Sequence, residues 1–258
     1  MMDNPIIYEK VDWEILTNKQ LGPKIKKIIE NIPSDVQSII DIGCGNGVIT
    51  NELAKKYQVL GVDRSKSALQ YVTSEKLEAS CDNIPLPSQN FDMVFSSELL
   101  EHLPNEIFQK TIQEFKRISK KYIYITVPNR ENPDKLMIRC PECKYIFNRP
   151  NHLRSFKSED FTVLFPEYKK IAEFTFGKPV RYYHPALLRL KRRWIPSISW
   201  IPYFWIDQNN RTAICPQCNH KFYYFYKFHP LGFLIDGINV IISPKRPYWL
   251  MVLLEKNS

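Results

Sequence analysis

An acid followed by three alternating glycines is the clearest signal for binding chemistry in this sequence. Asp41 precedes Gly43, Gly45 and Gly47, and this turn follows an apolar run and leads into residues with helical periodicity. Glycine tolerates positive φ and lets a ligand approach the backbone, while a helix start offers unpaired N–H groups. The pattern predicts a site for a nucleotide-like ligand. Because the Asp41 carboxylate would repel an anion, a ligand with a cationic amino group fits better than pyrophosphate.

Two further segments place polar residues near the ends of predicted strands. Asp63 ends the apolar run 59–62, and a carboxylate there can accept hydrogen bonds from both hydroxyls of a ribose. Residues 80–83 come before a loop and a predicted fourth strand over 91–95. Since the carboxyl ends of parallel strands meet at one edge of a sheet, we expect Asp63 to share a site with the 43–47 turn.

In order and spacing, these segments resemble the class I S-adenosylmethionine-dependent methyltransferases, especially the type 11 group, over roughly residues 36–130. The resemblance implies an α/β fold with a Rossmann-like, mostly parallel sheet, an antiparallel final strand, and S-adenosylmethionine as cofactor. It places the methionine part at the 43–47 turn, the ribose at Asp63 and the adenine at residues 80–83. Ser80 occupies the position where the family has an acid that contacts adenine. Asp82 either takes over the role of that acid or faces water. The predicted cofactor-binding residues are Asp41, Gly43, Cys44, Gly45, Gly47, Asp63, Arg64, Cys81, Asp82 and Ser96.

Two carboxylates and an imidazole follow the predicted fourth strand. Glu98, Glu101 and His102, at helical spacing, would suit a divalent metal or proton transfer. The pattern is similar to that of metal-dependent small-RNA 2′-O-methyltransferases of plants and some quinone-precursor O-methyltransferases. In the wider type 11 group a similar sequence has structural roles without a metal, so both readings stay open. His152 completes the predicted catalytic set, because residues 151–161 resemble the segment after the substrate lid, with Ser158 as the expected N-cap of a helix.

Four cysteines form two copies of one template, C-P-x-C-x-x-x-F, and each copy supplies two thiolates from a tight turn. Two such turns predict one tetrahedral, structural zinc site. A redox pair belongs at a strand-to-helix junction, and disulfides are disfavoured because the first residues do not read as a signal peptide. His152 or His220 in place of one cysteine stays an alternative. The predicted ligands are Cys140, Cys143, Cys215 and Cys218.

Charge is divided unequally along the 258 residues. Residues 1–135 carry 17 basic and 19 acidic side chains, whereas residues 136–258 carry 19 basic and 8 acidic ones, so the second half should hold the partner surface. Within it, residues 174–206 contain six basic residues, three tryptophans and no acid. Nucleic acid, an anionic membrane and an internal interface all suit such a segment. Because its tryptophans alternate with isoleucines, we favour an anionic membrane surface or a lipid-linked glycan over nucleic acid.

Three segments and one activity are expected. Residues 1–135 would bind the cofactor, residues 136–225 would form a zinc-binding, basic and aromatic insertion or substrate lid, and residues 226–258 would close the sheet. The expected reaction is methylation of an oxygen on a glycan, lipid-linked or small-molecule acceptor, in the cytoplasm or peripherally at a membrane. An RNA methyltransferase and a non-catalytic nucleic-acid-binding module on the same fold are the alternatives. The acceptor's identity and the oligomeric state are left open.

Overall fold

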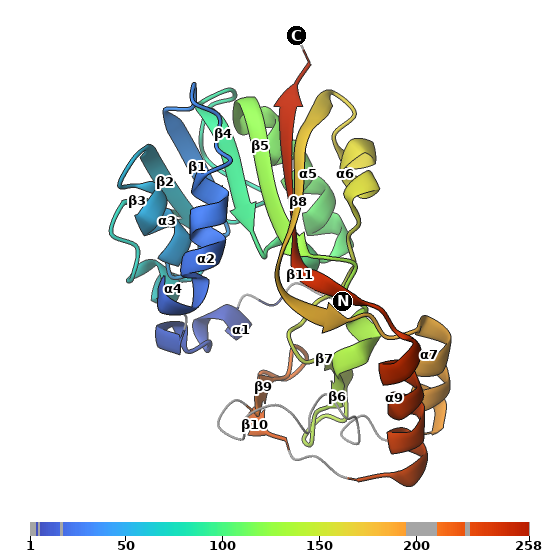
Figure 1. The fold of residues 1–258 in the computed structure, drawn as a ribbon. Coiled ribbons are helices and arrows are strands. Elements are labelled where there is room, and N and C mark those ends of the chain that lie inside the picture. The colour runs from blue at the N-terminus through green and yellow to red at the C-terminus, as the bar shows by residue number, and fades with distance from the viewer. Residues whose placement is uncertain (1–3, 5, 16–17, 195–210, 225–227, 258) are drawn as a thin grey trace. The chain divides into compact units, whose positions relative to one another are not determined.

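The computed structural model describes all residues except 1–3, 5, 16–17, 195–210, 225–227 and 258 (Figure 1). The chain folds into two compact units. Unit 1 comprises Met1–Pro128, Phe156–Gly177 and Trp249–Ser258, and unit 2 comprises Asn129–Ser155 and Lys178–Tyr248. The chain therefore passes between the units four times.

These units are defined by packing, whereas the three predicted segments were defined by function, so the functional division stays a prediction. The bounds differ in three places. Unit 2 begins at Asn129, which lies within the predicted cofactor-binding segment 1–135. Unit 1 includes Phe156–Gly177, which lies within the predicted insertion 136–225. Unit 2 includes the helix Pro230–Ile242, which lies within the predicted closing segment 226–258.

Unit 1 is built on a seven-stranded sheet with the order β3-β2-β1-β4-β5-β11-β8 (Figure 1). The strands are β1 (Ser38–Ile42), β2 (Gln58–Asp63), β3 (Glu75–Glu78), β4 (Phe91–Ser97), β5 (Ser119–Pro128), β8 (Tyr168–Arg181) and β11 (Lys245–Lys256). Neighbouring strands from β3 to β5 pair in parallel, and β11 pairs with β5 in the antiparallel sense. The predicted α/β fold, with a mostly parallel sheet and an antiparallel final strand, is confirmed.

Helices cover both faces of this sheet because its strands carry apolar side chains on both sides. The helices of unit 1 are α1 (Ile6–Glu9), α2 (Asn18–Ile29), α3 (Val48–Leu53), α4 (Lys66–Leu69), α5 (Asn105–Ile118) and α6 (Ser158–Leu164), with short 3-10 turns η1 (Trp13–Ile15) and η2 (Leu100–His102). On β1, Ile40 packs with Phe115 of α5, whereas Ile39 packs with Ile28 of α2 and Leu53 of α3. Since side chains alternate along a strand, Asp41 shares the face of Ile39.

The start of α6 differs from the prediction. Lys157, and not Ser158, is the N-cap, and the carboxylate of Asp160 accepts a hydrogen bond from the Lys157 backbone N–H at 2.9 Å. Ser158 is instead the first helical residue, and its hydroxyl contacts Lys170 and Glu173 of β8. An acid three residues into a helix can satisfy the cap by itself, which removes the need for a hydroxyl at the N-cap.

In its described residues, unit 2 contains two β-hairpins and two longer helices. Its elements are η3 (Pro133–Leu136), β6 (Met137–Arg139), β7 (Ile146–Asn148), α7 (Pro185–Trp194), β9 (Thr212–Ile214), β10 (Lys221–Tyr223) and α9 (Pro230–Ile242). β6 pairs with β7 and β9 pairs with β10, both antiparallel. The part of the predicted basic and aromatic segment 174–206 that follows α7, residues 195–206 with Trp200 and Trp205, lies outside the described residues. In the described part of the chain, no helix is long and apolar enough to cross a membrane.

Candidate cofactor site and candidate metal centre

The glycine turn after β1 has the backbone conformation that the sequence predicts. Gly43, Gly45 and Gly47 have φ of 77°, 53° and 73°, in the left-handed region that disfavours other residues. The turn is tied to β2, because the backbone N–H groups of Gly43 and Cys44 both donate to the carbonyl of Val62, at 2.8 and 3.1 Å. Gly47 is the N-cap of α3, so the first N–H groups of that helix lie next to the turn.

Asp41 lies behind this turn and is almost fully buried. One carboxylate oxygen, Oδ2, accepts a hydrogen bond from the Thr50 hydroxyl of α3 at 2.7 Å. The other, Oδ1, is buried and has no hydrogen-bond partner among the described residues. Burial raises the pKa of Asp41 to about 7, and the nearby Asp63 carboxylate adds to this effect. A buried carboxylate oxygen without a donor would gain from a cationic or N–H group in a ligand.

Asp63 lies at the end of β2 and connects the two sides of the predicted cofactor site. Its Oδ2 accepts from the backbone N–H of Gly45 at 2.8 Å, and its Oδ1 accepts from the N–H of Ser65 at 2.9 Å. Burial raises the pKa of Asp63 above its usual value. Each oxygen keeps a second acceptor position, so the carboxylate can still bind hydroxyl groups. Arg64 follows it, with its guanidinium 4.7 Å from the centre of the Tyr8 ring.

The remaining predicted cofactor residues lie in or beside the same strand ends. Residues 80–83 form a tight turn in which the Asn83 N–H donates to the Ser80 carbonyl at 3.1 Å. Asp82 accepts a hydrogen bond from the Ser80 hydroxyl, and the Cys81 sulfur accepts one from Thr111. Ser96 of β4 is buried and donates to the Ile42 carbonyl at 2.8 Å. These contacts locate the side chains, while their roles toward a cofactor stay predictions.

Glu98 is held in a way that the sequence did not predict. It precedes η2 with φ of 57°, so it does not continue a helix through Glu101 and His102 as their spacing suggested. Its Oε1 lies 3.2 Å from Nζ of Lys24, a residue of α2 whose side chain is 2% exposed. Lys24 also donates to the Ser97 hydroxyl at 2.9 Å and lies over the Trp249 ring at 4.7 Å. A buried lysine thus fixes the first predicted catalytic carboxylate at the carboxyl end of β4.

The other predicted catalytic residues are divided between the two units. Glu101 is buried and His102 is partly buried, both in η2 of unit 1. The His102 ring meets the Tyr8 ring edge-on, with the ring centres 6.4 Å apart. His152 belongs to unit 2, where it is buried, its Nδ1 pairs with the Glu131 carboxylate, and its backbone N–H donates to Asn148 at 3.0 Å.

The N-terminal segment around Tyr8 and Trp13 reaches the predicted cofactor site, and sequence reasoning missed it. The Asn46 amide donates to the Trp13 carbonyl at 2.6 Å, and a Cβ at Gly45 would lie 3.0 Å from the Trp13 ring. The Trp13 indole N–H in turn donates to the Tyr8 carbonyl at 3.0 Å. Tyr8 therefore links Arg64, on the ribose side, with His102, on the predicted acceptor side. The spacing of residues 6–15 does not predict these contacts, because the contacts depend on how the segment folds back.

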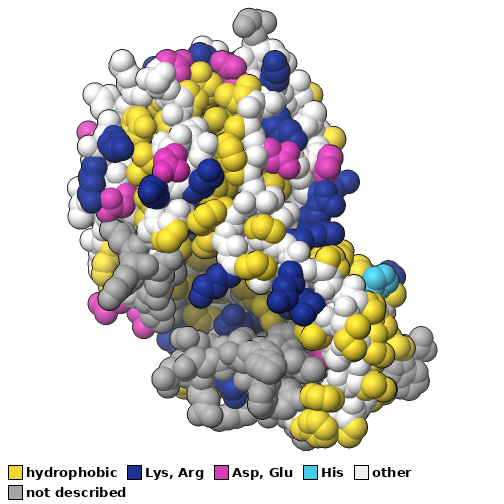
Figure 2. Space-filling view, viewed as in Figure 1, with side chains coloured by type: hydrophobic (Ala, Val, Ile, Leu, Met, Phe, Trp, Pro, Cys, Tyr) yellow, Lys and Arg dark blue, Asp and Glu magenta, His cyan; other side chains and the backbone are white. Residues whose placement is uncertain are grey.

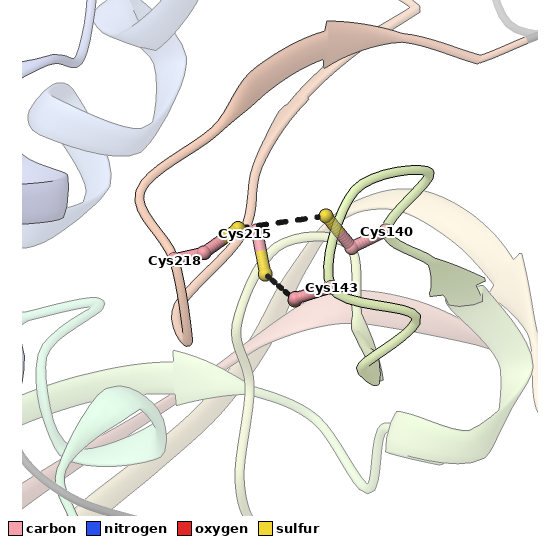
Figure 3. Close-up of side chains that lie close together, drawn as sticks. All are labelled: Cys140, Cys143, Cys215 and Cys218. Atoms are coloured by element: carbon pink, nitrogen blue, oxygen red, sulfur yellow. Dashed lines mark hydrogen bonds between the residues drawn. The ribbon is translucent and has the colours of Figure 1, made fainter.

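The four template cysteines of unit 2 come together (Figure 3). Their sulfurs all lie within 4.8 Å of one another, with 3.7 Å between Cys140 and Cys218 and 3.5 Å between Cys143 and Cys215. A disulfide needs a distance of about 2.05 Å, so these are free thiols, as are Cys44 and Cys81. Cys140 and Cys215 are buried, whereas Cys143 and Cys218 lie toward the surface.

The two cysteine turns are built alike, as the shared template implies. Each follows the first strand of a hairpin, and the N–H of its first cysteine donates to the carbonyl five residues later, at 2.9 Å in Cys140 and 3.0 Å in Cys215. Lys144 and Asn219, each directly after a second cysteine, both have φ near 60° (63° and 59°). The closing aromatics of the template, Phe147 and Phe222, are buried against each other edge-to-face. The template phenylalanines thus join the two turns through a shared core.

Comparison with known proteins agrees with the fold. Residues 39–122 match a family model described as a methyltransferase domain. A ubiquinone biosynthesis O-methyltransferase of Albidiferax ferrireducens is 31% identical over 99 residues, covering 33% of this chain and 39% of that protein. A pavine N-methyltransferase of Thalictrum flavum subsp. glaucum is 30% identical over 91 residues, covering 30% and 26%. The chain thus matches well under half the length of these relatives.

Solved structures extend the likeness over the whole chain. A SAM-dependent methyltransferase from Archaeoglobus fulgidus matches with a TM-score of 0.57 at 14% identity, over 93% of this chain and 95% of that one. At such an identity the match shows the fold alone. The expected methyltransferase fold is confirmed, and the family model and the relatives agree with a methyltransferase domain over residues 39–122.

Proposed function

We propose that this protein transfers a methyl group from S-adenosylmethionine to a hydroxyl of a glycan, lipid-linked or small-molecule acceptor. The single observation that carries the cofactor assignment is the buried Asp41, whose Oδ1 is without a hydrogen-bond partner among the described residues. The ammonium of a methionine moiety can supply the missing donors, which a pyrophosphate cannot.

The residues of unit 1 suggest a division of labour around that cofactor. Asp41 and the backbone N–H groups of the 43–47 turn would bind the methionine part, and Asp63 would accept hydrogen bonds from the ribose. The turn at 80–83 would border the adenine. The cofactor supplies an electrophilic methyl on a sulfonium, so the protein's main task is to position the acceptor.

Acceptor chemistry would depend on Glu98, Glu101 and His102, with His152 as the fourth candidate. Glu98 is partly exposed and held by Lys24, and a carboxylate so fixed can accept a hydrogen bond from an acceptor hydroxyl. His102 lies beside Tyr8 at the same strand ends and can orient or take the proton of that hydroxyl. We favour an oxygen acceptor for this reason, while the relatives include both O- and N-methyltransferases.

We further propose that Cys140, Cys143, Cys215 and Cys218 hold one structural zinc ion. Tetrahedral zinc with Zn–S bonds of about 2.3 Å requires sulfurs about 3.8 Å apart, close to the 3.7 and 3.5 Å that separate the paired cysteines. Four thiolates complete a tetrahedral shell and leave no position for a substrate, so the ion would stabilise the hairpins of unit 2.

Calorimetric titration with S-adenosylmethionine and S-adenosylhomocysteine tests the cofactor assignment. Wild type should bind both, and Asp41→Asn should bind each of them at least tenfold more weakly, because it loses the charge opposite the ammonium that both ligands carry. Asp35→Ala, which changes an exposed acid paired with Lys121, is the matched control. Transfer of labelled methyl to pooled glycans, small molecules or RNA then identifies the acceptor. Tight cofactor binding without transfer to any pool would favour a non-catalytic binding module.

A further inference from the structure

Helix α9 has the reverse of the polarity expected for a helix on the surface of a water-exposed protein. Its buried stripe contains Gly232, Ile235, Asp236 and Asn239, and the stripe continues to the buried Ser243 after the helix. Apart from Pro230 at its start, its exposed residues are large and apolar. A surface helix normally directs its apolar stripe to the core and its polar residues to water. In α9 the polar residues Asp236 and Asn239 are buried in unit 2, and most of the large apolar residues, except Ile235, are exposed.

The exposed side of α9 is extensive. Exposure reaches 83% at Ile241, 59% at Leu234 and 53% at Phe233, and Phe228 next to the helix packs on Phe233 with ring centres 5.9 Å apart. Figure 2 shows hydrophobic side chains gathered over α9 and α7. Contiguous exposed apolar surface of this kind is uncommon unless a partner or a membrane covers it. We call this set the α9 face; it consists of Phe228, Leu231, Phe233, Leu234, Ile238, Ile241 and Ile242.

A buried ion pair holds α9 in this orientation. Nζ of Lys191 in α7 lies 2.5 Å from Oδ2 of Asp236, and both side chains are 0% exposed. Asn239 adds a second contact, since its Oδ1 accepts the His184 backbone N–H at 2.9 Å. Rotating α9 to bury its apolar side would expose an aspartate and an asparagine and would take the Asp236 carboxylate away from the buried ammonium of Lys191, which is costly. The outward direction of the apolar residues is therefore fixed by polar contacts inside the unit.

The charge around the α9 face has one sign. Unit 2 contains 17 basic and 5 acidic residues, whereas unit 1 contains 19 and 22. Among the described residues of 178–248, Asp236 is the one acid, and its charge is paired inside the unit. Two exposed basic residues lie on neighbouring segments: Arg189 belongs to α7, which contacts α9, and Lys245 comes two residues after Ser243.

We propose that the α9 face docks on the surface of a bilayer that contains anionic phospholipid. Apolar side chains would enter the boundary between headgroups and acyl chains, and Arg189 and Lys245 would contact the phosphates. The helix has 13 residues, too few to span the hydrocarbon core, and so it would lie along the surface. A second copy of this chain fits less well, because a symmetric contact through α9 would bring together two units with the same large positive charge. This inference does not rest on the proposed methyl transfer.

The test is sedimentation of the full-length, zinc-loaded protein with vesicles of phosphatidylcholine alone or mixed with phosphatidylglycerol. Wild type should bind the mixed vesicles, with an affinity that falls as salt rises. Ile241→Gln and Leu234→Gln should each weaken partitioning about tenfold or more, as expected for losing one inserted aliphatic side chain. Val163→Gln is the matched control, since Val163 lies on helix α6 of unit 1 and is 80% exposed. Circular dichroism should find all three variants folded, because every changed side chain is on the surface.

Four results would overturn the proposal. Two of them are equal binding to both kinds of vesicle and no binding to either. The third is a loss of vesicle binding in Val163→Gln that equals the loss in the α9 variants. The fourth is a dimer in light scattering that Ile241→Gln dissociates, together with no vesicle binding. If the protein binds single-stranded RNA but not vesicles, and Ile241→Gln leaves the RNA affinity unchanged, the partner would be nucleic acid instead. Leu234→Trp sharpens a positive result, because the added tryptophan should show a blue-shifted emission and quenching by brominated lipid only in mixed vesicles.

Discussion

The two units keep their polar side chains in place by different means. In unit 1, two hydrophobic clusters of 21 and 11 buried residues sandwich the sheet, and the candidate site lies at strand ends that this sheet positions. In unit 2 the described core cluster has nine buried residues, two of them cysteines, and the hairpins have only three residues a strand. Four thiols and a buried ion pair supplement that core.

This difference implies that the two units depend on different interactions. Burial of apolar surface grows with core size, so unit 1 should stay folded through loss of one polar contact, while unit 2 should not. Small folds commonly need a metal or another cross-link because their cores are too small to overcome chain entropy. The predictions below test this contrast, starting with the largest effect.

Removal of the metal should show the difference in stability between the two units most clearly. Chelation, or Cys215→Ser, should abolish amide protection in β6, β7, β9 and β10 and leave β1 and β4 protected, because structural zinc contributes on the order of 10 kcal/mol of apparent binding free energy. Hydrogen exchange with mass spectrometry and elemental analysis measure both effects. Cys81→Ser, outside the cluster, should keep one zinc per chain. If Cys215→Ser keeps its zinc, the fourth ligand must be another side chain, such as His220.

Breaking the buried ion pair of unit 2 should have the next largest effect. Lys191→Met removes the ammonium that pairs with the buried Asp236 carboxylate and should lower the free energy of unfolding by about 3–5 kcal/mol. Lys191→Met combined with Asp236→Leu should recover most of that loss. Lys24→Met in unit 1 is the comparison, because Glu98 is 29% exposed and can be solvated by water once unpaired. Equal losses in Lys191→Met and Lys24→Met, measured by urea unfolding, would contradict the contrast between the units.

Asp63→Ala tests whether the strand end of β2 binds the cofactor. Losing hydrogen bonds to a charged acceptor should weaken S-adenosylmethionine binding by about 1–3 kcal/mol. The folded fraction should hardly change near room temperature, since the sheet and both clusters remain. Asp82→Ala distinguishes the two interpretations of that acid, because only an adenine contact would lower affinity. An unchanged dissociation constant in Asp63→Ala, or tight binding of NAD, would show that the site has another ligand.

Proton linkage at Asp41 gives the smallest effect. Burial raises the pKa of Asp41 to about 7 in the folded chain, so between about pH 4 and 7 the folded state binds more protons than the unfolded one and stability falls as pH rises. An ammonium placed beside Asp41 favours its ionised form, so cofactor binding should release a proton below about pH 7. Affinity should therefore rise about tenfold from about pH 6 to 8. Calorimetry in two buffers of different ionisation enthalpy detects the proton, and Asp41→Asn should abolish it.

Sequence patterns predicted the parts of this molecule that are local in the chain. The glycine turn, the acids that end β1 and β2, and the two cysteine turns each depend on residues within one short segment. Lys24 could not be found in this way, because its partners Ser97 and Glu98 come from a strand end far along the chain. The apolar stretch 230–242 also gave no sign of which side faces out. The orientation of the helix depends on the ion pair between Lys191 and Asp236, and these two residues come together only in the tertiary structure.

The position of β11 has a consequence for how the chain is synthesised. This strand is the last in sequence, yet it lies between β5 and β8. Until it leaves the ribosome, β5 and β8 each present an unpaired edge, and unit 1 waits for the whole of unit 2 to be made. A nascent chain arrested before Lys245 should therefore be sensitive to protease and bound by chaperones. Unit 1 can therefore complete its sheet only at the end of translation, although nearly all of the residues of unit 1 are synthesised earlier.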